Sequence, residues 1–360
     1  MNNKKFLLIS LAGIGDTLSI IPLIYVIRKN FPNDILDCLV MWKGSEDILK
    51  NNPNINSIIH FNMLKSGFFK TLIFCLKMRG KYDISINTYP QSKIYYRIIA
   101  WLIGAELRIS HTYDNHNFLD NFLVNKTVIQ DYNKHFIDNN LNLLNLLNIT
   151  KFTKEKSYNL YLSHYKLDVE RFILNSKIDK KILIGIHLGS GNTKNLALRR
   201  WPLDNYIKLI NNLILKYKPI HILLFGGPDE YNDQDYLLSK CNNLYNISCV
   251  RNNDILYSAA IINKCNLFIS VDTVFMHLAA VAKVPLQIVI KTPTFNKTVE
   301  PYANDFILIG GDIPANIYYK YDGYGIHGLK SNIINYMKSI SVEKVYNVVD
   351  YNLNKLLNPK

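Results

Sequence analysis

At 360 residues, the chain is too long for one ordinary hydrophobic core and about right for two domains. Hydrophobic residues make up 48% of the chain and charged residues 19%, a composition that excludes a disordered protein. The five cysteines are scattered and form no C-x-x-C pair, which argues against a disulfide framework or a zinc site and favours a reducing compartment.

The net charge is +14 and is spread evenly along the chain. Residues 1–165 hold 19 basic and 12 acidic side chains, and residues 166–360 hold 23 and 16. Compositional bias explains this charge as well as an anionic membrane face or an acidic acceptor would. No nucleic-acid-binding module or arginine-rich stripe accompanies it, so no nucleic-acid partner is expected.

The first apolar run, 6–10, follows two lysines but is too short for the core of a signal peptide, so it predicts a β-strand. No stretch approaches the roughly 18 apolar residues of a membrane-spanning helix, and a cytoplasmic protein is expected.

Short apolar runs then alternate with helical patterns along the chain. Strands are predicted at Phe6–Ser10, Ile35–Met41, Ser57–His60, Ile84–Asn87, Leu107–Ile109, Ile182–His187, His221–Phe225, Leu267–Val271 and Leu286–Ile290. Helices are predicted at Thr17–Asn30, Leu64–Arg79, Ser92–Leu102, Lys166–Asn175, Asp204–Lys216, Asp254–Asn263, Thr273–Lys283 and Val342–Leu357.

This alternation predicts an α/β protein with parallel, doubly wound sheets that carry helices on both faces. Such sheets bind ligands at the carboxyl ends of their strands. We expect domains at 1–165 and 166–330, because the polar, aperiodic segment 148–159 separates the two halves. Residues 331–360 would supply final helices that can pack back on the first domain.

The loop after the first predicted strand, Leu11–Thr17, is the first candidate site. Gly13 and Gly15 permit a tight turn and a close backbone approach, and Asp16 stands at the helix start, where its plain structural role would be an N-cap. The third glycine of G-x-G-x-x-G is missing, which disfavours a nicotinamide cofactor.

The second candidate site follows the strand that ends at His187. Ser190 and Gly191 allow backbone donors to face an anion, while Lys194 and Arg200 can neutralise it. The alternative is a solvated loop with two surface cations.

Two further strand ends carry polar residues. Gly226–Glu230 suits contact with a ribose or sugar hydroxyl, although its acids can equally serve a first helical turn. In Ser270–Ala280, Asp272 or Thr273 is placed to cap a helix whose N-terminus suits a phosphate or pyrophosphate. His277 on that helix is expected to be structural, or at most to position a ligand.

Several signatures are absent from the sequence, including the phosphate-binding P-loop, the G-x-S-x-G elbow and H-E-x-x-H. Asp233 and Asp235 have the spacing of a metal clamp but fall in a predicted helix, where residues two apart diverge. Neither a metal nor another cofactor is predicted.

Taken in order, these segments resemble the glycosyltransferase family 9 proteins. The similarity rests on the segments Ile14–Leu18 with Pro22, Asn30–Pro32, Leu49–Pro53, Lys81–Asp83, Gly189–Ser190, Arg200–Pro202, Gly226–Glu230 and Asp272–Ala279. It covers roughly residues 5–295. It implies the GT-B fold, in which two Rossmann-like domains face each other across a cleft, with the acceptor on the first domain and the donor on the second.

The resemblance also implies residue roles. Asp16 would be the general base of an inverting, metal-independent sugar transfer, and Arg200 would stabilise the leaving diphosphate. The donor would be a nucleotide-diphosphate sugar, ADP-heptose above all, and the acceptor an acidic lipopolysaccharide or lipooligosaccharide core reached at the inner face of the cytoplasmic membrane. Donor contacts are expected from Gly15, Ser190, Gly191, Lys194, Glu230, Asp272, Thr273 and His277.

Two departures from the family pattern keep alternatives open. Val274 replaces the usual glycine, and a β-branched residue resists positive φ and narrows the approach of a diphosphate. The 192–199 loop is also longer than usual. The alternatives are a different nucleotide sugar, a non-catalytic nucleotide-sugar-binding homologue, or an epimerase of similar architecture.

The acceptor side is inferred from position. Lys93 and Arg97, just after a predicted strand, are placed to meet acceptor phosphates or carboxylates. The segment Phe68–Arg79 combines aromatic and basic residues and could rest on an anionic membrane. The favoured interpretation is a core-packed helix with its cations outside.

Overall fold

The computed structural model describes residues 3–152, 158–189, 197–302, 305–320 and 326–358. The chain divides into two compact units. Unit 1 runs to Tyr161 and also takes in Asn296–Glu300, and unit 2 begins at Leu162 and comprises most of the remainder. The division lies close to the boundary at 165 expected from the sequence.

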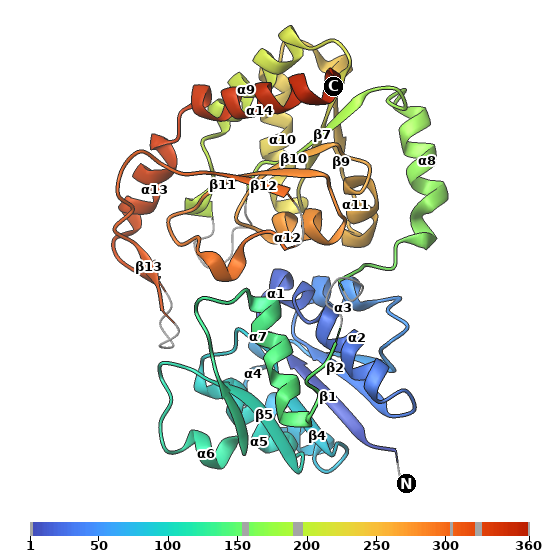
Figure 1. Ribbon diagram of the computed structural model, residues 1–360, viewed down its shortest axis with the longest axis vertical. Helices are drawn as coiled ribbons and strands as arrows, with labels where there is room; N and C mark the ends of the chain where they lie inside the picture. The colour runs from blue at the N-terminus through green and yellow to red at the C-terminus, as the bar shows by residue number, and fades with distance from the viewer. Residues whose placement is uncertain (1–2, 153–157, 190–196, 303–304, 321–325, 359–360) are drawn as a thin grey trace. The chain divides into compact units, whose positions relative to one another are not determined.

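Unit 1 is built on a six-stranded parallel sheet of order β3-β2-β1-β4-β5-β6 (Figure 1). Its strands are β1 (Lys5–Ser10), β2 (Ile35–Val40), β3 (Ser57–His60), β4 (Ile84–Asn87), β5 (Leu107–Thr112) and β6 (Lys126–Ile129). Its helices are α1 (Ile14–Leu18), α2 (Ile21–Asn30), α3 (Lys43–Leu49), α4 (Met63–Met78), α5 (Ile94–Ile103), α6 (Asp120–Leu123) and α7 (Phe136–Asn142).

Unit 2 repeats this plan with the order β12-β11-β10-β7-β8-β9. Its strands are β7 (Ile182–His187), β8 (Ile220–Phe225), β9 (Ile247–Val250), β10 (Leu267–Val271), β11 (Leu286–Ile290) and β12 (Asp305–Ile309). Its helices are α8 (Lys166–Asn175), α9 (Leu203–Lys216), α10 (Tyr231–Lys240), α11 (Ile255–Ile262), α12 (Val274–Val281), α13 (Lys330–Ser339) and α14 (Val342–Leu357). A separate two-stranded sheet joins β13 (Tyr318–Tyr319) to β14 (Ile326–His327).

The central strands read as continuous apolar runs because helices cover both faces of each sheet. Every residue of β8 and β10 is buried, as are the last five residues of β1. Numbered from the first strand of each unit, both sheets have the order 3-2-1-4-5-6. The expected α/β, doubly wound class is therefore confirmed.

The two-residue strands β13 and β14 were not predicted, and three strands of the large sheets were missed as well, namely β6, β9 and β12. All three are edge strands, and each is partly exposed, so its apolar signal is diluted. The predicted helix 17–30 is two helices, α1 and α2, separated at Ser19 and Ile20.

The final helix, which was expected to be able to pack back on the first domain, contributes its apolar side to unit 2. Val345, Val349 and Leu353 of α14 are fully buried in the core of unit 2, where α14 packs on α9. Every third or fourth residue of α14 is apolar, so the helix has one stripe to bury, and α9 covers that stripe.

The interpretation of 68–79 as a core-packed helix with only its cations outside also needs correction. Cys75 and Met78 of α4 do pack in the core of unit 1, but Phe68 and Phe69 are 75% and 77% exposed. Gly67, with φ of 76°, interrupts the helix just before them. No helix among the described residues combines the length and apolar character needed to cross a bilayer.

Candidate active site

Several of the predicted site residues that the structure describes follow strands at the carboxyl end of each sheet, at the point where the strand order reverses. In unit 1 this point lies between β1 and β4, and Asp16 and Lys93 follow these two strands. In unit 2 it lies between β7 and β10, which are followed by Gly189 and Asp272. Ligands of doubly wound sheets bind at such points, so the fold itself favours both locations.

Asp16 is held by its own loop. It is the third residue of α1, and its Oδ2 accepts a hydrogen bond of 2.6 Å from the N–H of Gly13. The expected N-cap role is therefore corrected, because Gly13 is the N-cap and Asp16 reaches back to it. Gly15 lies between them in the first turn. The Asp16 side chain is half-buried, which leaves its loop open to solvent.

Tyr96 of α5 belongs to the surroundings of Asp16. Burial is the main influence that raises the pKa of the Tyr96 phenol, followed by its neighbour Tyr95, and the Asp16 charge acts in the same direction. The phenol therefore stays protonated at neutral pH and can donate a hydrogen bond.

The two predicted acceptor contacts differ in environment. Lys93 is exposed and lies over the Tyr95 ring, 5.9 Å from its centroid. Arg97 is only 2% exposed, and its Nε pairs with the fully buried Asp120. A second nitrogen of Arg97 donates to the Ser92 carbonyl at 3.1 Å. Its guanidinium therefore holds α5 to α6, and Lys93 is the better placed of the two to meet a ligand.

In unit 2, Glu230 ends the loop after β8 and is 4% exposed. Its Oε2 accepts hydrogen bonds from the Gly227 N–H at 2.9 Å and from His187 Nε2 at 3.1 Å. Burial acts to raise the pKa of this carboxyl, but His187, the Gly227 N–H and Arg200 outweigh it, and the pKa is lowered. Glu230 Oε1 is buried without a hydrogen-bond partner among the described residues.

His187 was missed as a site residue in the sequence analysis. It is 2% exposed at the end of β7, its Nδ1 lies 3.1 Å from Thr273 Oγ1, and its ring stacks on Phe275 at 4.2 Å. Because a carboxylate only accepts hydrogen bonds, Nε2 must carry a proton toward Glu230. The signal that was available is a histidine at a strand end, two residues before Gly189.

Thr273 takes the N-cap position of α12, in extended conformation with φ of −148° and ψ of 176°. Its hydroxyl does not cap the helix, since it is turned to His187. Burial raises the pKa of the neighbouring Asp272 carboxyl, against the charge of Arg199 and a 3.3 Å hydrogen bond from Thr292 Oγ1.

The concern that Val274 would need positive φ is wrong. Val274 is the first residue of α12, and it is not among the described residues with positive φ. Only its bulk distinguishes it from glycine at this point. His277, one turn further on, is 7% exposed.

Arg200 lies among the second group of candidates. It donates to Asp233 of α10 at 2.6 Å. A Cβ at Gly189 would lie 2.8 Å from both Arg200 Nε and Glu230 Oε1, so a larger residue there would displace at least one of these two side chains. Ser190, Gly191 and Lys194, together with most of the 192–199 loop, lie outside the described residues.

Residues 74–321 match the profile of glycosyltransferase family 9 (heptosyltransferase). This match covers well over half of the chain. The chain belongs to glycosyltransferase family 9. It is therefore a heptosyltransferase-like glycosyltransferase, as the motifs indicated.

Individual proteins that are similar in sequence or in structure agree with this family assignment. Lipopolysaccharide heptosyltransferase 3 of Escherichia coli K12 is 23% identical in an alignment of 281 residues that covers 76% of this chain and 78% of that protein. A family 9 glycosyltransferase from Veillonella parvula has a similar crystal structure, with a TM-score of 0.77 at 21% identity over 99% of this chain and 98% of its own. The structure of E. coli heptosyltransferase WaaC with ADP-2-deoxy-2-fluoro heptose is also similar. Its TM-score is 0.69 at 15% sequence identity, and the match covers 97% of this chain and 99% of WaaC. The GT-B fold is thereby confirmed.

The possible metal clamp noted in the sequence is occupied by arginines. Asp233 pairs with Arg200, and Asp235 pairs with Arg251. Within the described parts of this family 9 chain, no three His, Cys, Asp or Glu side chains are grouped to hold a metal ion.

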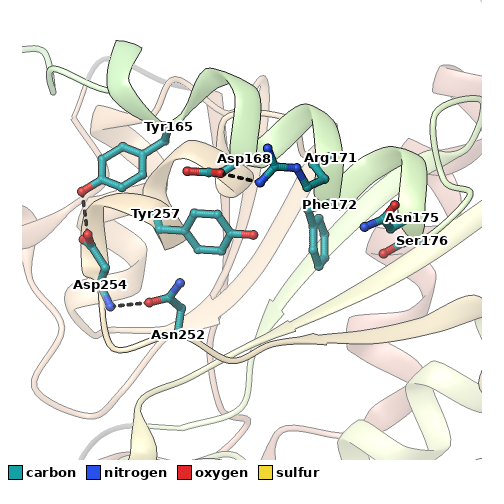
Figure 2. A pocket seen from close by; sticks show the side chains of 9 residues that line it. All are labelled: Tyr165, Asp168, Arg171, Phe172, Asn175, Ser176, Asn252, Asp254 and Tyr257. Atoms are coloured by element: carbon teal, nitrogen blue, oxygen red, sulfur yellow. Dashed lines mark hydrogen bonds and ion pairs between the residues drawn. The ribbon is translucent and has the colours of Figure 1, made fainter.

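A cavity of about 560 Å³ in unit 2 lies apart from these loops (Figure 2). It is bounded by α8 and by the loop that leads into α11, and it shares no lining residue with the predicted family 9 site. Two pairs of its polar side chains are bonded to each other: Tyr165 donates to Asp254 at 2.6 Å, and Arg171 donates to Asp168 at 3.2 Å. This cavity is therefore separate from the residues that carry the family motifs.

Proposed function

We propose that the protein transfers heptose from ADP-heptose to a lipopolysaccharide or lipooligosaccharide core, with inversion at the anomeric carbon and without a metal. Membership of family 9 carries this proposal. The relatives support it, because one is a lipopolysaccharide heptosyltransferase and another was solved with an ADP-heptose analogue.

In the proposed reaction, the acceptor hydroxyl forms the new bond to the anomeric carbon while the bond from that carbon to the diphosphate breaks. Asp16 takes the hydroxyl proton. Its fixed hydrogen bond to the Gly13 N–H supports this role, because a general base must be oriented before the transition state is reached. Such a base contributes about 10²–10⁴ in rate.

The leaving ADP develops negative charge, which preorganised donors stabilise without rearrangement. We assign this task to the N-terminus of α12 after Asp272 and Thr273, together with Arg200 and, in the loop outside the described residues, Ser190, Gly191 and Lys194. Gly15 and His277 would line the same donor site. Losing one such donor typically costs about 10²–10³ in rate.

Glu230 would bind the nucleoside. Its Oε1 is buried and lacks a partner among the described residues, which supports this role, since a ribose hydroxyl would satisfy it. His187 would hold Glu230 and Thr273 in one fixed arrangement through its two ring nitrogens.

We further propose that the enzyme works at the cytoplasmic face of the inner membrane, where it would be peripherally bound, because a lipopolysaccharide core is anchored in lipid. Lys93 would meet acidic groups of the acceptor. Arg97, predicted for the same role, would instead stabilise the acceptor site through its buried ion pair with Asp120.

A thermal-shift panel of ADP, UDP, GDP, CDP and CMP, with and without magnesium, tests the donor assignment. A ligand at 100 times its dissociation constant stabilises the folded state by about 2.7 kcal/mol. A magnesium-independent shift with ADP alone is expected. A shift with another nucleotide would indicate that the donor is a different nucleotide sugar. No shift with any nucleotide would indicate a non-catalytic homologue.

A further inference from the structure

The helices α4, α5 and α6 of unit 1 turn apolar side chains in two directions. The inner sides of α4 and α5 supply Cys75, Met78, Ile99 and Ile103 to the core against the sheet. Their outer sides are apolar as well. α6 adjoins α5 along the same side of the unit, where Trp101 and Phe122 have ring centroids 5.6 Å apart.

The outward side chains are strongly exposed. Phe68, Phe69, Phe118 and Phe122 are 75%, 77%, 81% and 64% exposed, and no other phenylalanine in the described ranges is an exposed residue. Monomeric proteins rarely leave so many large apolar groups together in water. We call this the α4–α6 surface, and its exposed apolar residues are Leu64, Phe68, Phe69, Ile73, Leu76, Tyr95, Ile98, Phe118, Leu119 and Phe122.

The charged side chains on α4 and α5 themselves are all basic, whereas the exposed acids Glu106 and Asp114 lie in the loops that flank β5. Residues 61–105 contain seven basic residues and one acidic residue, Asp83. Asp83 accepts a 2.7 Å hydrogen bond from the backbone N–H of Lys5, at the opposite end of the sheet from the site loops. Lys65, Lys70 and Lys77 are exposed between the apolar residues of α4.

We propose that the α4–α6 surface binds an anionic lipid bilayer, with its phenylalanines inserted at the headgroup boundary and its lysines paired with lipid phosphates. This proposal rests on the proposed function, because a lipid-linked acceptor is the reason for the enzyme to meet a membrane. Amphipathic helices with aromatic and basic residues on one side bind the membrane interface in this way.

A second copy of the chain fits this surface less well. A two-fold dimer would place the same patch on both partners, so the lysines of one copy would face the lysines of the other. Like charges brought together in a desolvated interface repel, whereas anionic headgroups neutralise them.

Co-sedimentation with vesicles tests the proposal. We expect binding to vesicles of phosphatidylglycerol and phosphatidylethanolamine, weaker binding at high salt, and little binding to pure phosphatidylcholine. Equal binding to both kinds of vesicle, or binding to neither, would overturn the proposal.

Two pairs of matched variants locate the surface. Phe68→Ser with Phe69→Ser should weaken binding by about tenfold or more, whereas Leu215→Ser with Tyr245→Ser, at exposed apolar positions of unit 2, should not. Lys65→Glu with Lys70→Glu should weaken binding by about 25-fold or more, at roughly fivefold for each lost lysine. Lys208→Glu with Lys218→Glu makes the same change in net charge on unit 2 and should have a much smaller effect.

Equal losses of vesicle binding in the test and control variants would mean that net charge or non-specific hydrophobic adsorption causes the binding, and the assignment of this surface would fail. A dimer that Phe68→Ser with Phe69→Ser converts to monomer, without a change in vesicle binding, would assign the surface to a second copy instead. The ADP-induced thermal shift of each variant separates this result from the proposed function. A variant that loses vesicles but keeps the ADP shift is folded and has an intact donor site.

Discussion

The two units use the same local structure around their main carboxylates but place it in different surroundings. In each, a glycine with extended backbone precedes a helical turn, and the acid three residues later accepts a hydrogen bond from the glycine N–H: Gly13 with Asp16 in unit 1, and Gly227 with Glu230 in unit 2. Asp16 is half-buried, whereas Glu230 is 4% exposed.

This comparison shows that local geometry does not decide what a carboxylate does. Glu230 has His187 and Arg200 to balance its charge, and its pKa is lowered, so it is suited to hold a ligand and not to take up a proton. The open loop of Asp16 suits an exchange of protons with an acceptor. The predictions below change one side of this comparison at a time.

The largest effect is expected for Asp16→Asn. Asparagine still accepts the Gly13 hydrogen bond but cannot take a proton, so turnover should fall by about 10²–10⁴. The rate of sugar transfer measures this loss, and the ADP-induced thermal shift should be unchanged. Turnover within a few-fold of the parent would remove Asp16 from the role of base.

His187→Phe should weaken ADP binding by about 10- to 100-fold, because it keeps a ring beside Phe275 but deletes the contacts to Glu230 and Thr273. Calorimetric titration with ADP measures the change. His221→Phe is the matched control, since His221 is equally buried in unit 2 and bonds to Ser248 at 2.8 Å, away from the site loops. If both variants lost the same affinity, the effect would be general destabilisation.

Glu230→Gln tests the buried side of the comparison through pH. At neutral pH the variant should be less stable by about 1–3 kcal/mol, since charge-assisted hydrogen bonds to His187 and Gly227 are weakened. The pKa of Glu230 is lowered from its ordinary 4.5, so its contribution is complete above about that pH and is lost as the pH falls through the folded-state value. Urea unfolding across this range should show the two proteins converging in acid. A constant difference at every pH would contradict the lowered pKa.

The smallest effect is expected for Val274→Gly. Because Val274 is already helical, glycine relieves no strain, and the free energy of unfolding should fall by less than about 1 kcal/mol. ADP affinity should change by less than a few-fold. A large gain in affinity for both Val274→Gly and Val274→Ala would show that the bulk of the valine side chain does limit the approach of the diphosphate.

Much of the fold was readable from the sequence because buried parallel strands are continuous apolar runs. The predicted strands 84–87 and 267–271 coincide with β4 and β10, and the predicted helices 166–175 and 342–357 coincide with α8 and α14. The edge strands β6, β9 and β12 were missed because partial exposure weakens that signal, although β3, an edge strand with the same burial pattern as β6, was predicted.

The site was readable only in part. Glycines and acids at strand ends pointed to Asp16, Glu230 and Asp272, but a sequence carries no sign of which side chains meet. The contact between His187 and Glu230 joins residues 43 apart, and it depends on the adjacent placement of β7 and β8 in the sheet. Burial likewise separates Arg97 from Lys93, although both are cations four residues apart.

Gly67 interrupts α4, and the residue type at this position is limited by the sign of its backbone φ angle and not by steric contact with neighbouring atoms. Its φ of 76° is unfavourable for an L-residue, yet a Cβ built there would meet no atom within 4 Å. A mirror-image alanine introduced by chemical synthesis would therefore keep the break and make it more rigid, whereas ordinary alanine would favour one continuous helix. The direction in which the Phe68 and Phe69 rings point is thus set by the chirality that this one position tolerates.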